Sequence, residues 1–356
     1  MFLSGGEVIL MNKKSGIING IIIVLSVVVL MAYIIFVDGL DNILSAFSNC
    51  RLEWLFVGVL AMIGYWYLEG HVLNKGLGIF NRKLNMKYSI KNCMIGQFFN
   101  SITPSATGGQ PIQAYYLNRC GIEYGFATSA LLLKFISFQF SLTFICIIVM
   151  IFKFNEYASQ IQGFTALMLI GFTINTCVAI GLILIGFNKK IALIIMRFFV
   201  KVLGKLRILK NVDKKLELVD DEVDLFSKGF STVLDNKKVI IKMFFLSILQ
   251  IILFYFVNVI ISLSFGISID FQSAFHIISG AACVQMSSTF IPLPGAAGGA
   301  ELSYYVIYGS VFEAGQLSAA VLLWRIYTFY MPIVVGLFFS KDLFGKKFDK
   351  SFSFKQ

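Results

Sequence analysis

Two cationic side chains, Lys134 and Arg325, lie inside stretches of sequence that are otherwise apolar. Placing an ionisable residue at the centre of a bilayer costs about 2.5–3.5 kcal/mol on insertion scales, so it normally faces a charged partner or a polar cavity. An ammonium and a guanidinium both bind phosphate or carboxylate oxygens, which makes recognition of an anionic group the chemistry to expect. An internal ion pair that holds helices together is the competing interpretation, and both stay open. Glu301 could pair with either cation, or could only stabilise the positive end of a helix.

Each cation follows a motif that combines proline, paired glycines and hydroxyl or amide side chains. The motifs read SITPSATGGQPIQAYY at residues 101–116 and IPLPGAAGGAELSYY at residues 291–305. At an offset of 190 they share the matches Pro104/Pro294, Ala106/Ala296, Gly108/Gly298, Gly109/Gly299 and Tyr115/Tyr305. The same offset carries Lys134 to position 324, next to Arg325. The motifs and the cations that follow them therefore indicate an internal repeat.

The residue types of both motifs predict a helical hairpin at each. Proline ends a helix, and paired glycines permit the left-handed or closely packed backbone that a tight reversal requires. The returning limb of each hairpin would aim free N–H groups and a positive helix end at the bilayer interior, which suits an anion. The candidate residues for binding a lipid head group are Pro104, Gly108, Gly109, Gln110, Lys134, Pro294, Gly298, Gly299, Glu301 and Arg325. Purely structural turns that pack helices tightly are the alternative.

The composition indicates a membrane protein. Hydrophobic residues make up 58% of the chain and charged residues 14%, unlike an ordinary soluble domain. Six windows reach the roughly 20 apolar residues that a spanning helix needs, namely 16–37, 53–73, 125–152, 161–187, 239–265 and 317–340. The first is too long for a signal-peptide core and lacks a small-residue cleavage site, so we expect it to be retained. Glu69 and His71, near the end of the second window, are interpreted as interfacial residues on the cytoplasmic side.

The net charge of +11 reports on topology. With the N-terminus inside, 26 of the 30 Lys and Arg residues fall on one side of the predicted membrane. Loops rich in Lys and Arg face the cytoplasm, so both termini are expected there. No basic–aromatic patch or recognition module accompanies the charge, and nucleic acid is therefore not expected as a partner.

The flanks of the two hairpins predict opposite orientations. Lys91 and Arg119 flank the first hairpin and belong inside, whereas Asp270 and Glu313 flank the second and fall outside. The expected architecture is an all-α polytopic membrane protein with about six full transmembrane helices plus two re-entrant helical hairpins, arranged as an inverted repeat. It forms a single membrane domain over residues 1–356. Repeat one covers about 53–187, a cytoplasmic amphipathic connector about 188–238, and repeat two about 239–340.

The connector carries two amphipathic patterns. Apolar residues from Val212 to Val233 recur at spacings of four and three, which indicates a helix with a narrow apolar seam. Before them, KKIALIIMRFFVKVLGKLR combines apolar faces with basic residues, as expected of a helix that lies on an anionic leaflet. An interfacial elbow between the repeats is the modest interpretation, and a contact in a homodimer or with a partner stays open.

The cysteines and histidines offer no catalytic or metal-binding set. The six cysteines form no CxxC pair, and the two histidines lie at no metal-binding spacing from them. We expect no cofactor and no metal, and the arrangement of Ser, His and Asp residues does not support a hydrolytic site. His276 is interpreted as a buried histidine with satisfied hydrogen bonds.

Three segments resemble the signature regions of a known family. They are TPSATGGQPIQAYYLNRCG, PLPGAAGGAE and WRIYTFYMPIVVG. In this order they resemble the lysylphosphatidylglycerol synthase transmembrane-domain family, which includes the flippase half of the bacterial multiple-peptide-resistance lipid synthase/flippase. The matching positions are Pro104, Gly108, Gly109 and Pro111, then Pro292, Pro294, Gly295, Gly298 and Glu301, and finally Arg325, Tyr330, Pro332 and Gly336. The second segment departs from the family pattern at Ala296 and Ala297.

The resemblance implies a flippase-like phospholipid translocase of a bacterial plasma membrane. Its lipids would be anionic or aminoacylated and of the phosphatidylglycerol type, and its role would be resistance to cationic antimicrobial peptides. Relatives that transfer lysine carry a further cytosolic domain that uses charged transfer RNA, and no residues of this chain match it, so we expect no enzyme activity from this chain alone. Two alternatives stay open: a phosphatidylglycerol lysyltransferase, which the family label suggests, and an ion-coupled small-solute transporter, which the inverted repeat would also fit.

Overall fold

The computed structural model describes residues 47–48, 50–103, 106–160, 164–205, 236–289, 291, 293–313, 315–340 and 343, together with Leu216, Val219 and Val223. All regular secondary structure within these residues is helical. The α-helices are α3 (Leu52–Ile79), α4 (Met86–Ser101), α5 (Gly109–Arg119), α6 (Tyr124–Gln160), α7 (Phe164–Phe187), α8 (Lys189–Lys205), α10 (Lys237–Ser264), α11 (Phe271–Ser288), α12 (Gly299–Tyr308), α13 (Gln316–Arg325) and α14 (Met331–Ser340). Two single turns complete the set, the 3₁₀ turn η2 (Pro294–Ala296) and the π-helical turn η3 (Ile326–Tyr330).

Four of the predicted spans are confirmed as long apolar helices. They are α3, residues Tyr124–Lys153 of α6, α10, and the run Gln316–Ser340 that joins α13, η3 and α14. The predicted window 161–187 corresponds to α7, of which Leu169–Gly181 forms a shorter apolar helix. The window 16–37 lies outside the described residues. The described part therefore has the helices of a multi-pass membrane protein.

Large apolar side chains cover much of the outside of the bundle. Phe56, Ile151, Phe152, Val334 and Phe338 are 64%, 71%, 71%, 67% and 66% exposed. Soluble proteins rarely expose large contiguous apolar surfaces, whereas membrane helices meet lipid tails that are as apolar as leucine. These side chains are therefore assigned to the surface that contacts lipid.

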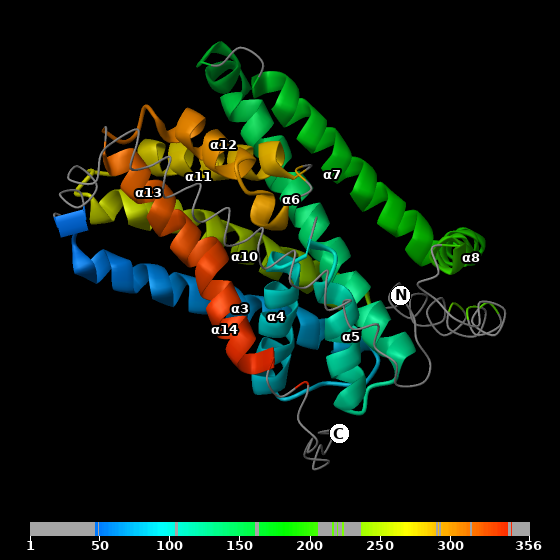
Figure 1. Cartoon of the computed structure of the whole chain (residues 1–356). Coiled ribbons are helices and arrows are strands. Elements are labelled where there is room, and N and C mark those ends of the chain that lie inside the picture. Colours follow the sequence, from blue (N-terminus) through cyan, green and yellow to red (C-terminus); the bar gives the residue numbers. More distant parts are fainter. Residues whose placement is uncertain are drawn as a thin grey trace.

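The helices α3 and α10 pack along each other (Figure 1). Glycines in α3 allow its neighbours to come close. A Cβ atom at Gly64 would lie 2.8 Å from the side chain of Leu253 in α10, and one at Gly70 would lie 2.9 Å from Ile90 in α4. Small residues let membrane helices approach each other closely, so these glycines let α3 fit closely against α10 and α4.

Each motif lies between two short helices that pack against each other. The first motif separates α4 from α5, and the second separates α11 from α12. The first pair shares a buried core with the second half of α3 and the start of α6, and the second pair shares a larger core with α10 and α13. The helices are thus interrupted at both motifs, while their orientation as re-entrant hairpins of an inverted repeat stays a prediction.

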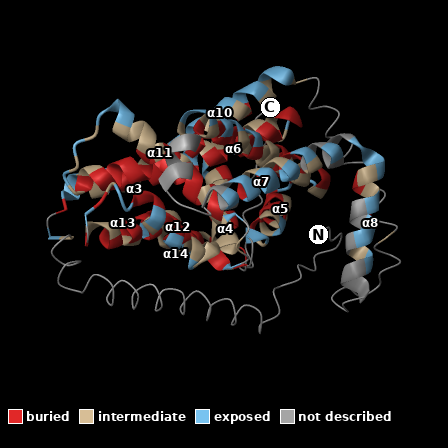
Figure 2. Cartoon of the chain, turned by 90° about the horizontal axis from the view of Figure 1, so that it is seen from above, coloured by how far each residue is buried: buried red, intermediate tan, exposed pale blue. Residues whose placement is uncertain are grey.

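Each helix pair also contacts a helix from the other half of the chain. In the C-terminal half, α14 packs on α4, and in the N-terminal half, α7 packs on α11 (Figure 1). Buried residues accordingly concentrate in the middle of the bundle, where the two halves meet (Figure 2). The two motif-bearing pairs are therefore held in place by helices from both halves.

The π-helical turn η3 interrupts the last span directly after Arg325. Pro332 has no N–H to donate to the carbonyl of Thr328, four residues earlier, and its ring crowds that carbonyl. A π turn is one way in which a helix absorbs such a defect. Arg325 therefore lies at the junction of two helical segments rather than inside a regular helix.

The helix α8 leaves the end of α7 at a sharp corner (Figure 1). Asn188 Oδ1 accepts hydrogen bonds from two N–H groups of the first turn of α8, at 3.0 and 3.2 Å, which is the side-chain cap expected at a helix start. From the predicted seam of the connector, Val219 and Val223 are buried and form a small core with Ala192 of α8. Leu216 is partly buried, and the rest of that seam lies outside the described residues. In Figure 2, α8 stands at the periphery of the bundle.

Candidate functional site

The first motif forms a loop that closes on its own polar side chains. The helix α4 ends at Ser101 and α5 begins at Gly109. Thr103 Oγ1 accepts a hydrogen bond from the Gly108 N–H at 2.9 Å, and Asn100 Oδ1 accepts one from the Gly109 N–H at 2.8 Å. The N–H groups of Gly108 and Gly109 are therefore occupied within the loop.

The second motif reverses the chain through left-handed residues. Gly295 and Gly298 have φ angles of 63° and 85°, which glycine adopts without a steric penalty. The helix α12 then begins at Gly299, and Glu301 Oε2 accepts a hydrogen bond from the Gly298 N–H at 2.8 Å. The carboxylate of Glu301 thus caps the helix to which it belongs.

The prediction of free N–H groups is wrong at Gly108, Gly109 and Gly298. A buried backbone N–H needs an acceptor, and each motif has a polar side chain within ten residues that supplies one. An anion at these loops would consequently be held by side chains rather than by these three N–H groups.

One backbone feature supports the internal repeat. Ala106 and Ala296, which the offset of 190 aligns, both have a φ angle of 52°. They are two of the three non-glycine residues with positive φ in the described part of the chain, and this conformation is unfavourable for L-residues. The two loops differ after these alanines, because Gly108 has a φ angle of −82° where Gly298 has 85°.

Replacing Gly109 by alanine is expected to lower the free energy of unfolding by about 1–3 kcal/mol, as overpacking usually does. A Cβ atom there would lie 2.3 Å from Asn100 Oδ1 and 2.5 Å from the Gly96 carbonyl oxygen, so the contact between α4 and α5 must open. Gly181→Ala in α7 is the matched control, because a Cβ atom there meets nothing within 4 Å and alanine is the better helix former. Thermal unfolding in detergent measures both variants, and equal melting temperatures would contradict the close contact.

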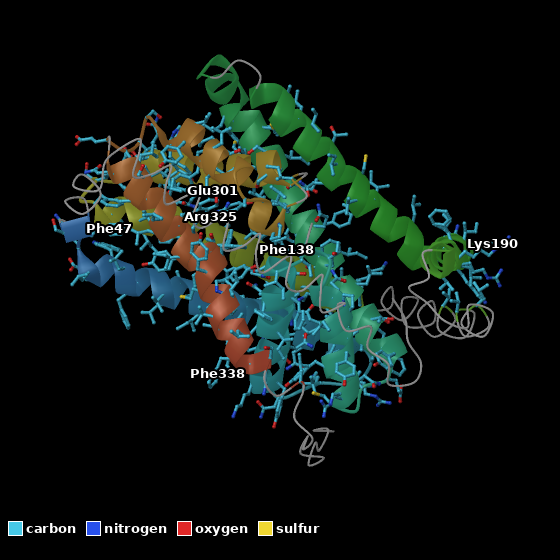
Figure 3. The ribbon with its side chains drawn as sticks, viewed as in Figure 1. Phe47, Phe138, Lys190, Glu301, Arg325 and Phe338 are labelled. Carbon is cyan, nitrogen blue, oxygen red and sulfur yellow. The ribbon has the colours of Figure 1, made fainter. Side chains whose placement is uncertain are left out.

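Arg325 and Glu301 form a buried ion pair beside the second motif (Figure 3). Nη2 of Arg325 lies 2.7 Å from Glu301 Oε2, and the two side chains are 5% and 11% exposed. Nη1 of Arg325 donates a hydrogen bond to the carbonyl oxygen of Gly295 at 2.9 Å. A single guanidinium therefore connects the end of α13 to both η2 and the first turn of α12.

The guanidinium of Arg325 retains hydrogen-bonding capacity. Among the described residues its Nε has no hydrogen-bond acceptor, and Nη2 contacts Glu301 at short range but outside hydrogen-bond geometry. The Cζ atom lies 4.7 Å from the ring centroid of Trp324 and 5.5 Å from that of Phe329. A buried donor without an acceptor costs about 1–3 kcal/mol, so this position suits a group that binds a further anionic oxygen.

Lys134 forms a second buried ion pair, with Glu69 of α3. Its Nζ lies 2.8 Å from Glu69 Oε1, and the side chains are 12% and 11% exposed. Gln97 Nε2 of α4 donates to Glu69 Oε2 at 2.7 Å and lies 3.3 Å from Tyr65 Oη. The Sγ atom of Cys93 lies 4.0 Å from Lys134 Nζ. This polar cluster joins α3, α4 and α6 inside the membrane region.

The interpretation of Glu69 as a residue solvated at the membrane interface is wrong. Its side chain is 11% exposed and pairs with Lys134, so it neither reaches solvent nor lacks a partner. The sequence carries no signal that would have placed it, because Asn74 and Lys75 follow within six residues and favour the cytoplasmic surface. Glu301 was expected to pair with either cation, and it pairs with Arg325.

The structure does not bring the predicted site residues together in one place. Pro294, Gly298, Gly299, Glu301 and Arg325 come together at the second motif, whereas Lys134 lies with Glu69. Gly108, Gly109 and Gln110 form the start of α5, and Pro104 lies outside the described residues.

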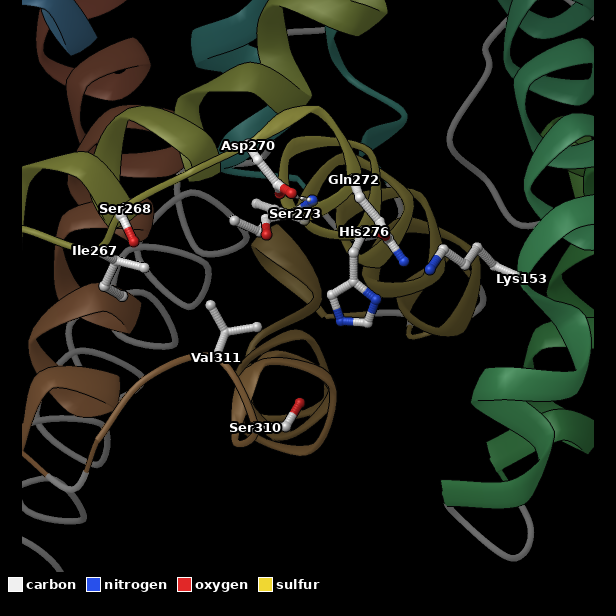
Figure 4. Close-up of a pocket in the computed structure, with 10 residues that line it drawn as sticks. Lys153, Ile267, Ser268, Asp270, Gln272, Ser273, His276, Ser310 and Val311 are labelled. Atoms are coloured by element: carbon white, nitrogen blue, oxygen red, sulfur yellow. Dashed lines mark hydrogen bonds between the residues drawn. The ribbon is translucent and has the colours of Figure 1, made fainter.

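A separate polar pocket of about 430 Å³ lies between α6, the first turns of α11 with the loop before them, and the loop after α12 (Figure 4). Its lining includes Lys153, Asp270 and His276. The sequence analysis expected His276 to be buried, but its side chain faces this pocket and is only partly buried. Asp270 accepts a hydrogen bond from the Ser273 N–H at 2.8 Å, and hydrogen bonds from Ser273 hold the pKa of the Asp270 carboxyl below its usual value. No residue of either ion pair lines this pocket.

Comparison with known proteins gives two matches. A family model described as the lysylphosphatidylglycerol synthase TM region matches residues 20–336, which include both motifs and both ion pairs. A UPF0104 membrane protein of Archaeoglobus fulgidus is 25% identical over 305 residues, and the match covers 80% of this chain and 86% of that protein.

Proposed function

Because the chain belongs to the lysylphosphatidylglycerol synthase transmembrane-region family, we propose that it translocates phospholipids between the leaflets of a membrane. The proposed substrates are anionic or aminoacylated lipids of the phosphatidylglycerol type. The proposed setting is a bacterial plasma membrane, where such lipids reduce the binding of cationic antimicrobial peptides. Both termini would lie in the cytoplasm, on the side that collects most of the Lys and Arg residues.

The buried guanidinium of Arg325 is the observation that carries this proposal. Arg325 is 4% exposed, belongs to a membrane-spanning run, and adjoins a loop that breaks two helices. Its Nε has no acceptor among the described residues. The planar fork of a guanidinium matches phosphate oxygens, so a phosphodiester head group beside η2 would bind to Arg325 and compete with Glu301.

Lys134 is proposed as the second cation on the path of the head group. Both cations are neutralised by a carboxylate at 2.7–2.8 Å. A head group would therefore have to displace a carboxylate from each cation. This competition weakens the binding of the head group enough for release, as transport requires. The acyl chains would stay in the bilayer, against the exposed apolar side chains of the spans.

The helix pairs α4–α5 and α11–α12 are proposed to enter the membrane from opposite sides as re-entrant hairpins. Broken helices at membrane depth are tolerated only within protein or beside a wet cavity, and inverted repeats of such helices form transport sites near the midplane. The shared φ angle of Ala106 and Ala296 and the contacts of each pair with the opposite half support this arrangement. Alternating movements of the two halves would then pass the head group across.

Leaflet exchange of head-group-labelled phosphatidylglycerol in liposomes tests the proposal. We expect exchange to be faster in vesicles with the protein than in protein-free vesicles. The double variant Lys134→Gln/Arg325→Gln should exchange no faster than protein-free vesicles, because both cations are lost. Glu123→Gln is the matched control, since Glu123 is 61% exposed in a surface pair with Arg82. Exchange that survives in the double variant would contradict the head-group role of the cations.

The same preparation separates the two alternatives. A phosphatidylglycerol lysyltransferase would form lysyl-lipid from phosphatidylglycerol and charged transfer RNA, and we expect no such product. An ion-coupled small-solute transporter would bind a small solute and carry no phospholipid through purification. We expect phospholipid to co-purify with the protein, as detected by mass spectrometry of the extracted sample.

A further inference from the structure

We infer that Glu69 is a proton-binding site that couples the binding of an anionic head group at Lys134 to the uptake of one proton. The inference rests on the proposed function, because it requires a phosphate group that competes with Glu69 for Lys134. In the proposed function the two cations bind the head group, and Glu69 only pairs with Lys134. The inference gives Glu69 a role of its own.

The geometry makes Glu69 and a phosphate competitors for one ammonium group. Lys134 Nζ lies 2.8 Å from Glu69 Oε1, and the two side chains are almost fully buried. Once a phosphate takes Lys134, the donors left to the Glu69 carboxylate among the described residues are the amide of Gln97 and the weakly donating thiol of Cys93, and neither carries a charge. A buried charge that loses its partner is strongly unfavourable, and ionisable groups avoid this state by becoming neutral.

Uptake of a proton by Glu69 balances the charges of the exchange. Before it, the carboxylate and the ammonium sum to zero. A proton from water then binds to a carboxylate oxygen, which leaves a neutral acid beside the ammonium and a net charge of one. The single negative charge of a phosphodiester restores neutrality, and no electrons move.

The surroundings of Glu69 can hold its neutral form. Gln97 donates to Glu69 Oε2 now, and an amide that turns over can instead accept the proton of a carboxylic acid. The titratable and charged groups facing Glu69 are Tyr65 of α3, Cys93 of α4 and Lys134 of α6. From α10, Gln250 hydrogen-bonds to Tyr65, and in η3 the Tyr327 hydroxyl is bonded to the Leu55 carbonyl, far along α3. Among the described residues, Lys134 is therefore the cation that Glu69 contacts.

The surroundings of Glu301 stabilise its carboxylate more than those of Glu69 do, so we assign the proton to Glu69 of the Lys134–Glu69 pair. Glu301 is in the first turn of α12 and accepts the Gly298 N–H. The positive end of the helix and this N–H stabilise its carboxylate even when Arg325 binds another anion. Glu69 lies in the interior of α3, away from either helix end, and has no such support.

Proton uptake on lipid binding is the direct test. Purified protein in a weakly buffered detergent solution is mixed with short-chain phosphatidylglycerol, and the pH change is followed with an indicator dye while a thermal shift reports binding. We expect uptake of about one proton per protein when the lipid binds. Glu69→Gln should bind the lipid without uptake, because the amide imitates the neutral acid. Glu123→Gln should behave as the unmodified protein does.

Leaflet exchange over a pH series provides the second readout. Exchange by the unmodified protein should slow as the pH rises, because fewer Glu69 side chains carry a proton, whereas exchange by Glu69→Gln should not depend on pH. Lipid binding without proton uptake, or equal uptake by Glu69→Gln, would overturn the inference and leave the proposed function standing. Absence of both lipid binding and exchange would overturn the proposed function, and this inference with it.

Discussion

Replacing Arg325 by methionine is expected to abolish lipid exchange and to lower the free energy of unfolding by about 3–5 kcal/mol, the usual effect of removing one partner of a buried ion pair. The change leaves the Glu301 carboxylate without its cation and the Gly295 carbonyl oxygen without its donor. Thermal or denaturant unfolding in detergent measures the stability, and leaflet exchange in liposomes measures the activity.

Two further variants separate charge from geometry at this position. Arg325→Lys keeps the positive charge but cannot reach Gly295 and Glu301 with a planar fork, so it should retain more stability than Arg325→Met and still lose most exchange. The double variant Glu301→Gln/Arg325→Met should recover part of the lost stability, because it no longer buries an unpaired carboxylate. An unchanged unfolding midpoint in Arg325→Met would contradict the buried pair.

Replacing Lys134 by methionine is expected to lower the free energy of unfolding by a similar amount, about 3–5 kcal/mol at neutral pH. Glu69 would remain as a buried anion with one amide donor. The loss should shrink as the pH falls, because protonation of Glu69 removes the unpaired charge. Unfolding of the variant and of the unmodified protein over the same pH series measures this difference.

A second substitution checks the origin of that loss. Glu69→Gln/Lys134→Met removes both charges and keeps an amide next to Gln97, so the double variant should be clearly more stable than Lys134→Met at neutral pH. Equal stability of the two variants would mean that lost packing, rather than a stranded carboxylate, causes the destabilisation.

Local patterns predicted the spans and the interruptions of the helices. Hydropathy over about 20 residues is a property of the contiguous chain, and four predicted windows match apolar helices. The breaks at Gly108 and Gly298 follow from Pro and Gly, whose backbone preferences need no tertiary contact. The signature segments likewise identified the family from the sequence.

The partners of the buried charges required the fold. Glu69 and Lys134 are 65 residues apart in sequence, and no local pattern connects residues on different helices. The capture of the Gly109 N–H by Asn100, nine residues earlier, depends on how α4 and α5 close on each other. The repeat could not supply these partners either. The offset of 190 carries Lys134 to the position next to Arg325, but their carboxylate partners come from α3 and α12, which the offset does not relate.

The opposite entry of the two helix pairs is tested most directly by thiol labelling from each side of the membrane. Single cysteines are placed at the outer ends of each pair, in a background without the six native cysteines. For α4–α5 the positions are Lys87, in the first turn of α4, and Glu123, after α5. For α11–α12 they are Gln272, in the first turn of α11, and Glu313, after α12. All four positions are exposed. We predict that a membrane-impermeant reagent labels the first two only from the cytoplasmic side and the last two only from the other side. Labelling of all four from one side, or of the two flanks of a pair from different sides, would contradict the inverted hairpins.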